Sequence, residues 1–176
     1  FNIFFGPSVN SAHGVANQIS GQLGALSNNM QKAVNPVIVK SEGDQNKEMQ
    51  KKVSFTACKF SYILLGIFAI PMIFETSYLL RLWLVNVPTY SIIFLQLILI
   101  KNLVDQIARP LYTVIASTGK IKELSIITST LFITSLISIY CLLKNSFPPY
   151  SVYLVLLIVG FTISLVIYPY YLKKIN

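Results

Sequence analysis

The sequence predicts an all-α integral membrane protein with about five transmembrane helices in a single bundle over residues 1–176. Apolar residues make up 54% of the chain and charged residues only 11%, whereas soluble domains carry about 25% charged residues. Several apolar stretches reach the roughly 20 residues that a helix needs to cross a bilayer. Lysines concentrate in alternate connections, as the positive-inside rule requires of a multi-pass protein.

The first two segments differ sharply in polarity. Residues 1–13 mix aromatic residues with Gly6 and Pro7, which favours an interfacial loop. Residues 14–39 predict a helix with no breaker before Pro36, but amides interrupt its apolar positions. Glycines would let it pack closely against other helices as a span. The alternative is an amphipathic helix lying on the membrane surface.

A charged loop and a second span follow. Residues 40–52 hold four lysines and three acids, which predicts a solvated cytoplasmic loop with a short helix. Residues 53–74 predict the next span. Residues 75–90 carry Tyr78, Trp83 and Tyr90, residue types of the membrane interface. They predict an interfacial element or, alternatively, a gate over a cavity.

The stretch 90–117 is long and apolar enough to span, yet it carries three charges. Its fourteen Leu, Ile, Phe and Val residues supply on the order of 4–8 kcal/mol of insertion free energy, while each central charge costs about 2.5–3.5 kcal/mol. Helical periodicity places the polar residues within one arc of roughly 140°. We therefore predict a helix that lines a polar cavity, kinked near Pro110. The alternative is an ion pair that only fixes helix packing. Cavity candidates on this helix are Lys101, Asn102, Asp105, Gln106 and Arg109, and those on the first helix are Asn17, Gln18 and Gln22.

Residues 123–143 and 150–172 predict two further spans. If the connections 40–52, 118–122 and 173–176 lie on one side, that side holds eight lysines, whereas Arg81 and Lys144 are the basic residues on the other. This asymmetry places the C-terminal end in the cytoplasm.

Several function classes lack their residue patterns. The net charge of +8 is spread along the chain without a basic aromatic patch, which argues against nucleic-acid binding. Cys58 and Cys141 lie in different apolar helices, near opposite faces of the bilayer, so no disulfide is expected. Neither a metal-ligand spacing nor a catalytic motif occurs, so we expect no cofactor, no metal and no enzymatic activity.

Short motifs in several connections resemble those of bacterial polysaccharide flippases, the O-antigen and capsule transporters related to multidrug and toxin exporters. The matching stretches are Asn2–Pro7, Asn10–Ala12, Gly14–Gln18, Asn35-Pro36, Gly43-Asp44 and Thr118–Lys122. The resemblance covers most of the chain. Several family members carry arginine where this chain has His13, so the resemblance does not imply a fixed positive charge at this position. A lone histidine of this kind is more often an interfacial or packing residue than a proton relay.

The resemblance implies an inner-membrane transporter of 12–14 helices built as two bundles around a cavity, of which this chain would be most of the second. The chain begins with Phe1 rather than methionine, so we expect a piece of a longer protein. The implied activity is translocation of an undecaprenyl-diphosphate-linked oligosaccharide, with membrane lipids, a polysaccharide polymerase and glycosyltransferases as partners. The alternatives are a cation-coupled multidrug exporter of the same fold and a non-transport membrane subunit of polysaccharide assembly.

Overall fold

The computed structural model describes the backbone of residues 2–175 and the side chains of residues 4–174, and this part of the chain is all-helical. Its elements are α1 (Asn2–Gly43), α2 (Lys47–Phe74), α3 (Thr76–Trp83), α4 (Ser91–Ser117), α5 (Lys122–Lys144), α6 (Ser151–Phe161), the π-helix η1 (Thr162–Ile167) and α7 (Tyr168–Ile175). Four segments are long and apolar enough to cross a membrane: α2, α4, α5 and the run Ser151–Lys174.

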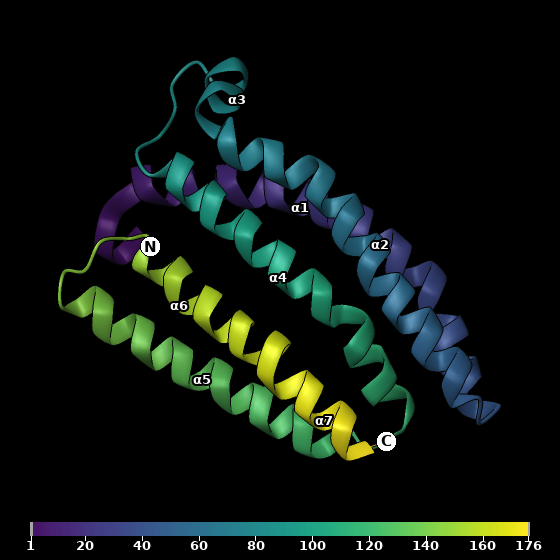
Figure 1. Ribbon diagram of the computed structural model, residues 1–176. Helices are drawn as coiled ribbons and strands as arrows, with labels where there is room; N and C mark the ends of the chain where they lie inside the picture. The colour runs from purple at the N-terminus through teal and green to yellow at the C-terminus, as the bar shows by residue number, and fades with distance from the viewer. Residues whose placement is uncertain (1, 176) are drawn as a thin grey trace.

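Helix α4 lies at the centre of the bundle. Figure 1 shows it between two groups, α1 with α2 on one side and α5 with α6 and α7 on the other. Its buried residues point in several directions, as a helix surrounded by neighbours requires. In contrast, α5 has few buried residues and exposes apolar side chains over most of its length. Such a surface suits lipid contact.

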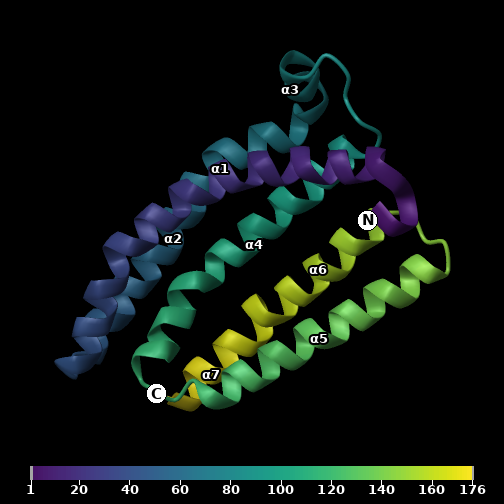
Figure 2. The same cartoon turned by 180° about the vertical axis from the view of Figure 1, so that it is seen from behind.

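The first helix is longer than the sequence predicts. Residues 2–13 were expected to form an interfacial loop, but they are helical and bend where Gly6 adopts φ 77°. Pro7 follows at a position where a helix tolerates proline, because the first turn needs no amide donor there. The helix then runs past Pro36 to Gly43 beside α2 and α4 (Figure 2). It is not among the segments apolar enough to span, so the fifth crossing remains a prediction.

The predicted loop 40–52 is mostly helical. The break between α1 and α2 covers only Asp44–Asn46, where Gln45 takes a left-handed conformation with φ 53°. Asn46 caps α2 by accepting a hydrogen bond from the backbone N–H of Met49 at 2.9 Å. The lysines of this region therefore lie on helix ends.

Small residues let α2 pack closely within the bundle. Its buried positions include Ser54, Ala57 and Ser61, spaced three or four residues apart, and Ala69 two turns further along. The hydroxyls of Ser54 and Ser61 donate to carbonyls one turn earlier, each at 2.6 Å. Such local bonds satisfy hydroxyl groups in a helix that lies in lipid.

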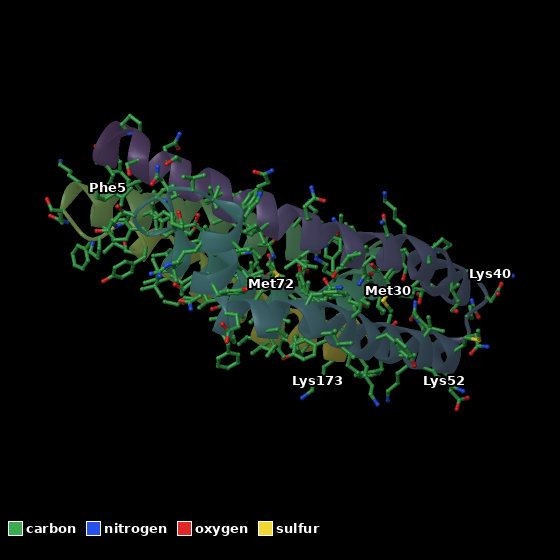
Figure 3. The ribbon with its side chains drawn as sticks, turned by 90° about the horizontal axis from the view of Figure 1, so that it is seen from above. Phe5, Met30, Lys40, Lys52, Met72 and Lys173 are labelled. Carbon is green, nitrogen blue, oxygen red and sulfur yellow. The ribbon has the colours of Figure 1, made fainter. Side chains whose placement is uncertain are left out.

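The basic connections gather at one end of the bundle, here called the lysine-rich end: the α1–α2 turn, the α4–α5 turn and the C-terminal turn of α7 (Figure 1). Gln50 Nε2 donates to Ser117 Oγ at 3.2 Å, which joins the first two, and Lys174 pairs with Glu123 at 2.6 Å, which joins the last two. Figure 3 places Lys40 and Lys52 at the end opposite Phe5.

Candidate functional site

A cavity of about 640 Å³ opens between α1, α4, α5 and the α6–η1–α7 segment. It is lined from α1 by Asn28, Gln31, Lys32 and Asn35, from α4 by Lys101, Asp105, Ala108, Arg109, Tyr112 and Thr113, and from the remaining helices by Thr128, Phe132, Leu156, Gly160, Ile163, Ser164 and Tyr168. The polar residues come mainly from α1 and α4. We refer to it below as the charged cavity.

The three charges predicted on α4 all line this cavity. Lys101 Nζ contacts Asp105 Oδ2 at 2.5 Å, and the two side chains are 26% and 25% exposed. They lie four residues apart on one helix face, so the pair forms without ordering a second helix. Burial of this degree makes the pairing more valuable than at a fully exposed surface, because solvent screens it less.

Gly160 of α6 lets this ion pair fit against the neighbouring helix. A Cβ atom at Gly160 would lie 3.2 Å from Asp105 Oδ1 and 3.8 Å from Lys101 Cγ. Such a contact is tight, so a side chain there would push the carboxylate aside. Because Gly160 has no side chain, the ion pair has room between α4 and α6.

Hydrogen bonds connect α1 to α4 along the side of the cavity. Asn102 Nδ2 donates to Ser20 Oγ at 2.8 Å, the Arg109 guanidinium donates to Asn28 Oδ1, and Thr113 Oγ1 donates to Asn35 Oδ1 at 3.0 Å. Both residue numbers rise together, so the two helices run parallel. This register places the second half of α1 against the charged part of α4.

Cations outnumber carboxylates in the lining. Lys32, Lys101 and Arg109 contribute positive charge, and Asp105 is the lining carboxylate. Asp105 is engaged by Lys101, and neither Lys32 nor Arg109 has an ion-pair partner within the described side chains. The charged cavity therefore favours an anionic ligand.

The cavity also offers uncharged donors. Gln31 is 7% exposed, and its Nε2 makes no hydrogen bond within residues 4–174. A buried amide donor without a partner costs free energy, so a ligand acceptor there would be favourable. Gln31 and Arg109 together could bind a ligand that carries both hydroxyl groups and negative charge.

A π-helical segment forms part of the wall. Ile163 and Ser164 of η1 line the cavity, and the ring of Tyr168 lies 5.9 Å from that of Tyr112. A π-helical turn inside a longer helix is uncommon and occurs frequently at functional sites. No apolar pattern in 150–172 distinguished this segment from an ordinary span.

The remaining predicted residues lie elsewhere. Asn102 bonds to Ser20, and Gln106 is only 1% exposed with no partner for its Nε2 in the described part of the chain. Asn17, Gln18 and Gln22 are exposed on α1, and Asn17 Nδ2 lies 2.8 Å from His13 Nε2. None of these five lines the charged cavity.

The sequence reasoning missed the cavity residues of α1 and α6. The amides and the lysine at 28–35 lie in the predicted first helix, as do Asn17, Gln18 and Gln22. Only the alignment of α1 with α4 shows that the residues at 28–35, and not the other three, face the cavity. Gly160 gave no signal, because a lone glycine in an apolar span has no distinctive spacing. Residues 4–174 hold no group of three or more His, Cys, Asp or Glu side chains placed to bind a metal.

These observations define a class of protein. The described chain is an all-helical, multi-pass membrane protein with a cationic cavity between its helices. Comparisons with family models, curated proteins and solved structures find no match to this chain.

Proposed function

We propose that this chain is part of a flippase that translocates a lipid-linked oligosaccharide of the undecaprenyl-diphosphate type across the bacterial inner membrane for O-antigen or capsule synthesis. The observation that carries the proposal is the charged cavity, in which two cations, Lys32 and Arg109, are not paired with a carboxylate. A diphosphate and a glycan cannot cross hydrocarbon unaided, so a carrier must supply charge and hydrogen bonds within the membrane.

The position of the cavity fits uptake from the cytoplasmic side. Arg109 lies eight residues from the end of α4, about 12 Å along the helix axis, and Lys101 lies about 24 Å from that end. The charged cavity thus extends from the middle of α4 toward the lysine-rich end, which the positive-inside rule assigns to the cytoplasm. In this proposal the diphosphate binds near Arg109 and Lys32, and Gln31 donates to the saccharide.

The ion pair sets the strength of this binding. Asp105 neutralises Lys101 in the empty cavity, so an incoming diphosphate competes with the carboxylate for Lys101 while meeting Arg109 directly. Binding tight enough to capture the substrate yet weak enough to release it requires such partial neutralisation. Arg109 is therefore the residue whose loss should affect binding most.

The same-fold alternative, a cation-coupled drug exporter, needs carboxylates that face the ligand. Asp105 is the carboxylate of the lining, and it is held by Lys101. A cationic drug would meet two further positive charges. The charge balance of the cavity thus favours the anionic substrate.

The test is Arg109→Gln in the full protein, with Arg81→Gln as the matched control at the opposite end of the bundle. We expect Arg109→Gln to weaken binding of a diphosphate-linked saccharide lipid about tenfold or more, because a hydrogen bond to a charged group contributes about 1.5–3 kcal/mol. Surface polysaccharide should fall with membrane insertion unchanged, and Arg81→Gln should leave both at wild-type values.

Two outcomes would reject the proposal. Unaltered lipid binding and polysaccharide in Arg109→Gln would favour a non-transport subunit. Saturable binding of a cationic dye, abolished by Asp105→Asn, without binding of the saccharide lipid would favour the drug exporter.

A further inference from the structure

A second recess, of about 520 Å³, lies at the lysine-rich end on the other face of α4. Leu111 and Val114 face this recess, whereas Arg109 and Tyr112 face the charged cavity. At about 100° per residue the two pairs point in roughly opposite directions. The recess is therefore separate from the proposed substrate site.

The lining of the recess changes from polar to apolar along α2. Lys47, Glu48 and Lys51 lie on the first turns of the helix, and Phe55 lies two turns deeper, about 12 Å from Lys47. Leu111 and Val114 of α4 and Leu172 of α7 form the apolar wall opposite. This depth is less than half of the roughly 30 Å hydrocarbon core, so the recess starts at the interface and stays within one leaflet.

The lining of the recess holds two lysines and one carboxylate. Lys51 forms no ion pair within residues 4–174, and Lys47, although it contacts Glu42 at 2.6 Å, keeps a side chain that is 51% exposed. Glu48 is the carboxylate of the lining. Basic pockets between membrane helices at the cytoplasmic face bind anionic lipid head groups.

The polar end of the recess is held in place. Gln50 Nε2 donates to Glu42 Oε2 at 2.9 Å and to Ser117 Oγ at 3.2 Å, which ties α2 to α1 and α4. Phe55, by contrast, is 60% exposed, so its ring is available to an acyl chain. A fixed cationic rim above an open apolar wall matches the two parts of a phospholipid.

We propose that this recess binds one anionic phospholipid of the leaflet at the lysine-rich end. Its phosphate lies between Lys47 and Lys51, and the upper part of an acyl chain packs against Phe55, Leu111 and Leu172. The bound lipid fills the space that α2 forms with α4 and α7.

The test uses a tryptophan placed at position 55 (Phe55→Trp) in the full protein, with its other tryptophans, Trp83 included, replaced by phenylalanine. The protein is reconstituted with brominated phosphatidylglycerol or brominated phosphatidylcholine, whose bromines quench nearby tryptophans. We expect phosphatidylglycerol to quench Trp at 55 with about tenfold higher relative affinity than phosphatidylcholine, because Lys51 contributes about fivefold in favour of an anionic lipid and Lys47, which is paired with Glu42, contributes less.

Matched variants distinguish a site from general surface attraction. Lys51→Gln should reduce the preference about fivefold, while Lys52→Gln, which removes the same charge from a residue outside the recess, should leave most of it. A tryptophan at position 137, on the exposed face of α5, should show no preference. Equal quenching by both lipids, equal effects of the two lysine variants, or displacement by excess inorganic phosphate would each overturn the proposal.

Discussion

The two halves of the bundle are packed differently. The half that contains the start of α4, here called the sealed half, holds a large apolar core that draws Ala12 and Ala16 from α1, Leu65 and Ala69 from α2, and Phe94, Leu95 and Leu99 from α4. The half near the lysine-rich end holds only a small cluster of Ile115, Leu124 and Tyr171 with its partly buried neighbours. The lipid recess lies in this open half, and the charged cavity extends into it from the middle of the bundle.

Aromatic contacts close the sealed half across three helices. The ring of Phe94 lies 4.7 Å from that of Tyr153, and Tyr153 OH lies 2.5 Å from His13 Nδ1. These residues come from α4, α6 and α1, so one cluster joins both groups of helices. In the open half α1 and α4 are joined by polar contacts, such as the hydrogen bond from Arg109 to Asn28.

This difference implies that the sealed half provides most of the stability of the bundle and that the open half provides the ligand contacts. Close packing of apolar side chains provides most of the attraction between membrane helices, and it is concentrated where no ligand is proposed to bind. The polar contacts of the open half can be exchanged for contacts with a ligand at little net cost. Substitutions should therefore affect stability in one half and binding in the other.

The largest effect is expected for Phe94→Ala in the sealed half. Phe94 is fully buried, and truncating a buried phenylalanine costs about 3–5 kcal/mol, since both its contacts and the filled volume are lost. Phe132→Ala is the matched control, because Phe132 lines the charged cavity and is 48% exposed, so its loss should cost less than about 1 kcal/mol. Thermal denaturation of the purified protein in detergent measures both values. Similar losses for the two variants would contradict the division into halves.

A smaller effect is expected for Gly160→Leu, at the border between the halves. A side chain there must displace Asp105 and separate α6 from α4, and overpacking of this kind costs about 1–3 kcal/mol. Gly24→Leu is the control, because no atom lies within 4 Å of a Cβ at Gly24 and leucine favours the helix over glycine. The same denaturation assay should show a loss for Gly160→Leu only. Equal stability of both variants would mean that α6 does not rest closely on the ion pair.

The sequence was sufficient for the apolar spans. The predicted ranges 53–74, 90–117 and 123–143 differ from α2, α4 and α5 by at most six residues at either end, and 150–172 matches the run α6–η1–α7. Apolar length is a local property, so no tertiary information is needed to find it. The helical segments at 2–13 and 40–52 were harder to predict. Gly6 and Pro7 in the first segment and the many charges in the second suggested loops, although α1 and α2 extend through them.

The cavity was only partly predictable. Lys101, Asp105 and Arg109 share a helix face, so periodicity alone brings them together. The same periodicity includes Asn102, whose side chain instead donates to Ser20 of α1. The predicted polar arc of α4 faces both α1 and the cavity, and a single sequence does not show which residues face which. Asn28, Gln31 and Lys32 depend on the register between α1 and α4, which is a property of packing and leaves no local pattern.

The smallest effect concerns acid sensitivity at the α1–α2 turn, outside the apolar spans. A hydrogen bond from Lys47 lowers the pKa of Glu42 below its usual value of 4.5. A carboxyl group with a lowered folded-state pKa stabilises the fold fully above its unfolded pKa, and this contribution is lost as the pH falls through the folded-state value. The turn should therefore loosen between about pH 4.5 and the lower folded-state pKa, by less than about 1 kcal/mol, since the pair is largely solvent-accessible.

Hydrogen exchange of the amides of residues 43–50, compared at about pH 6 and about pH 3.5 after correction for intrinsic rates, measures this change. Glu42→Gln should abolish the extra acid sensitivity of the turn, because no ionisable carboxyl remains at that position to bind a proton. Asp44→Asn is the control, since the side chain of Asp44 makes no hydrogen bond or ion pair within residues 4–174, and it should leave the wild-type response. If Asp44→Asn removed the response and Glu42→Gln preserved it, the lysine-rich end would be fixed by contacts other than the Glu42–Lys47 pair.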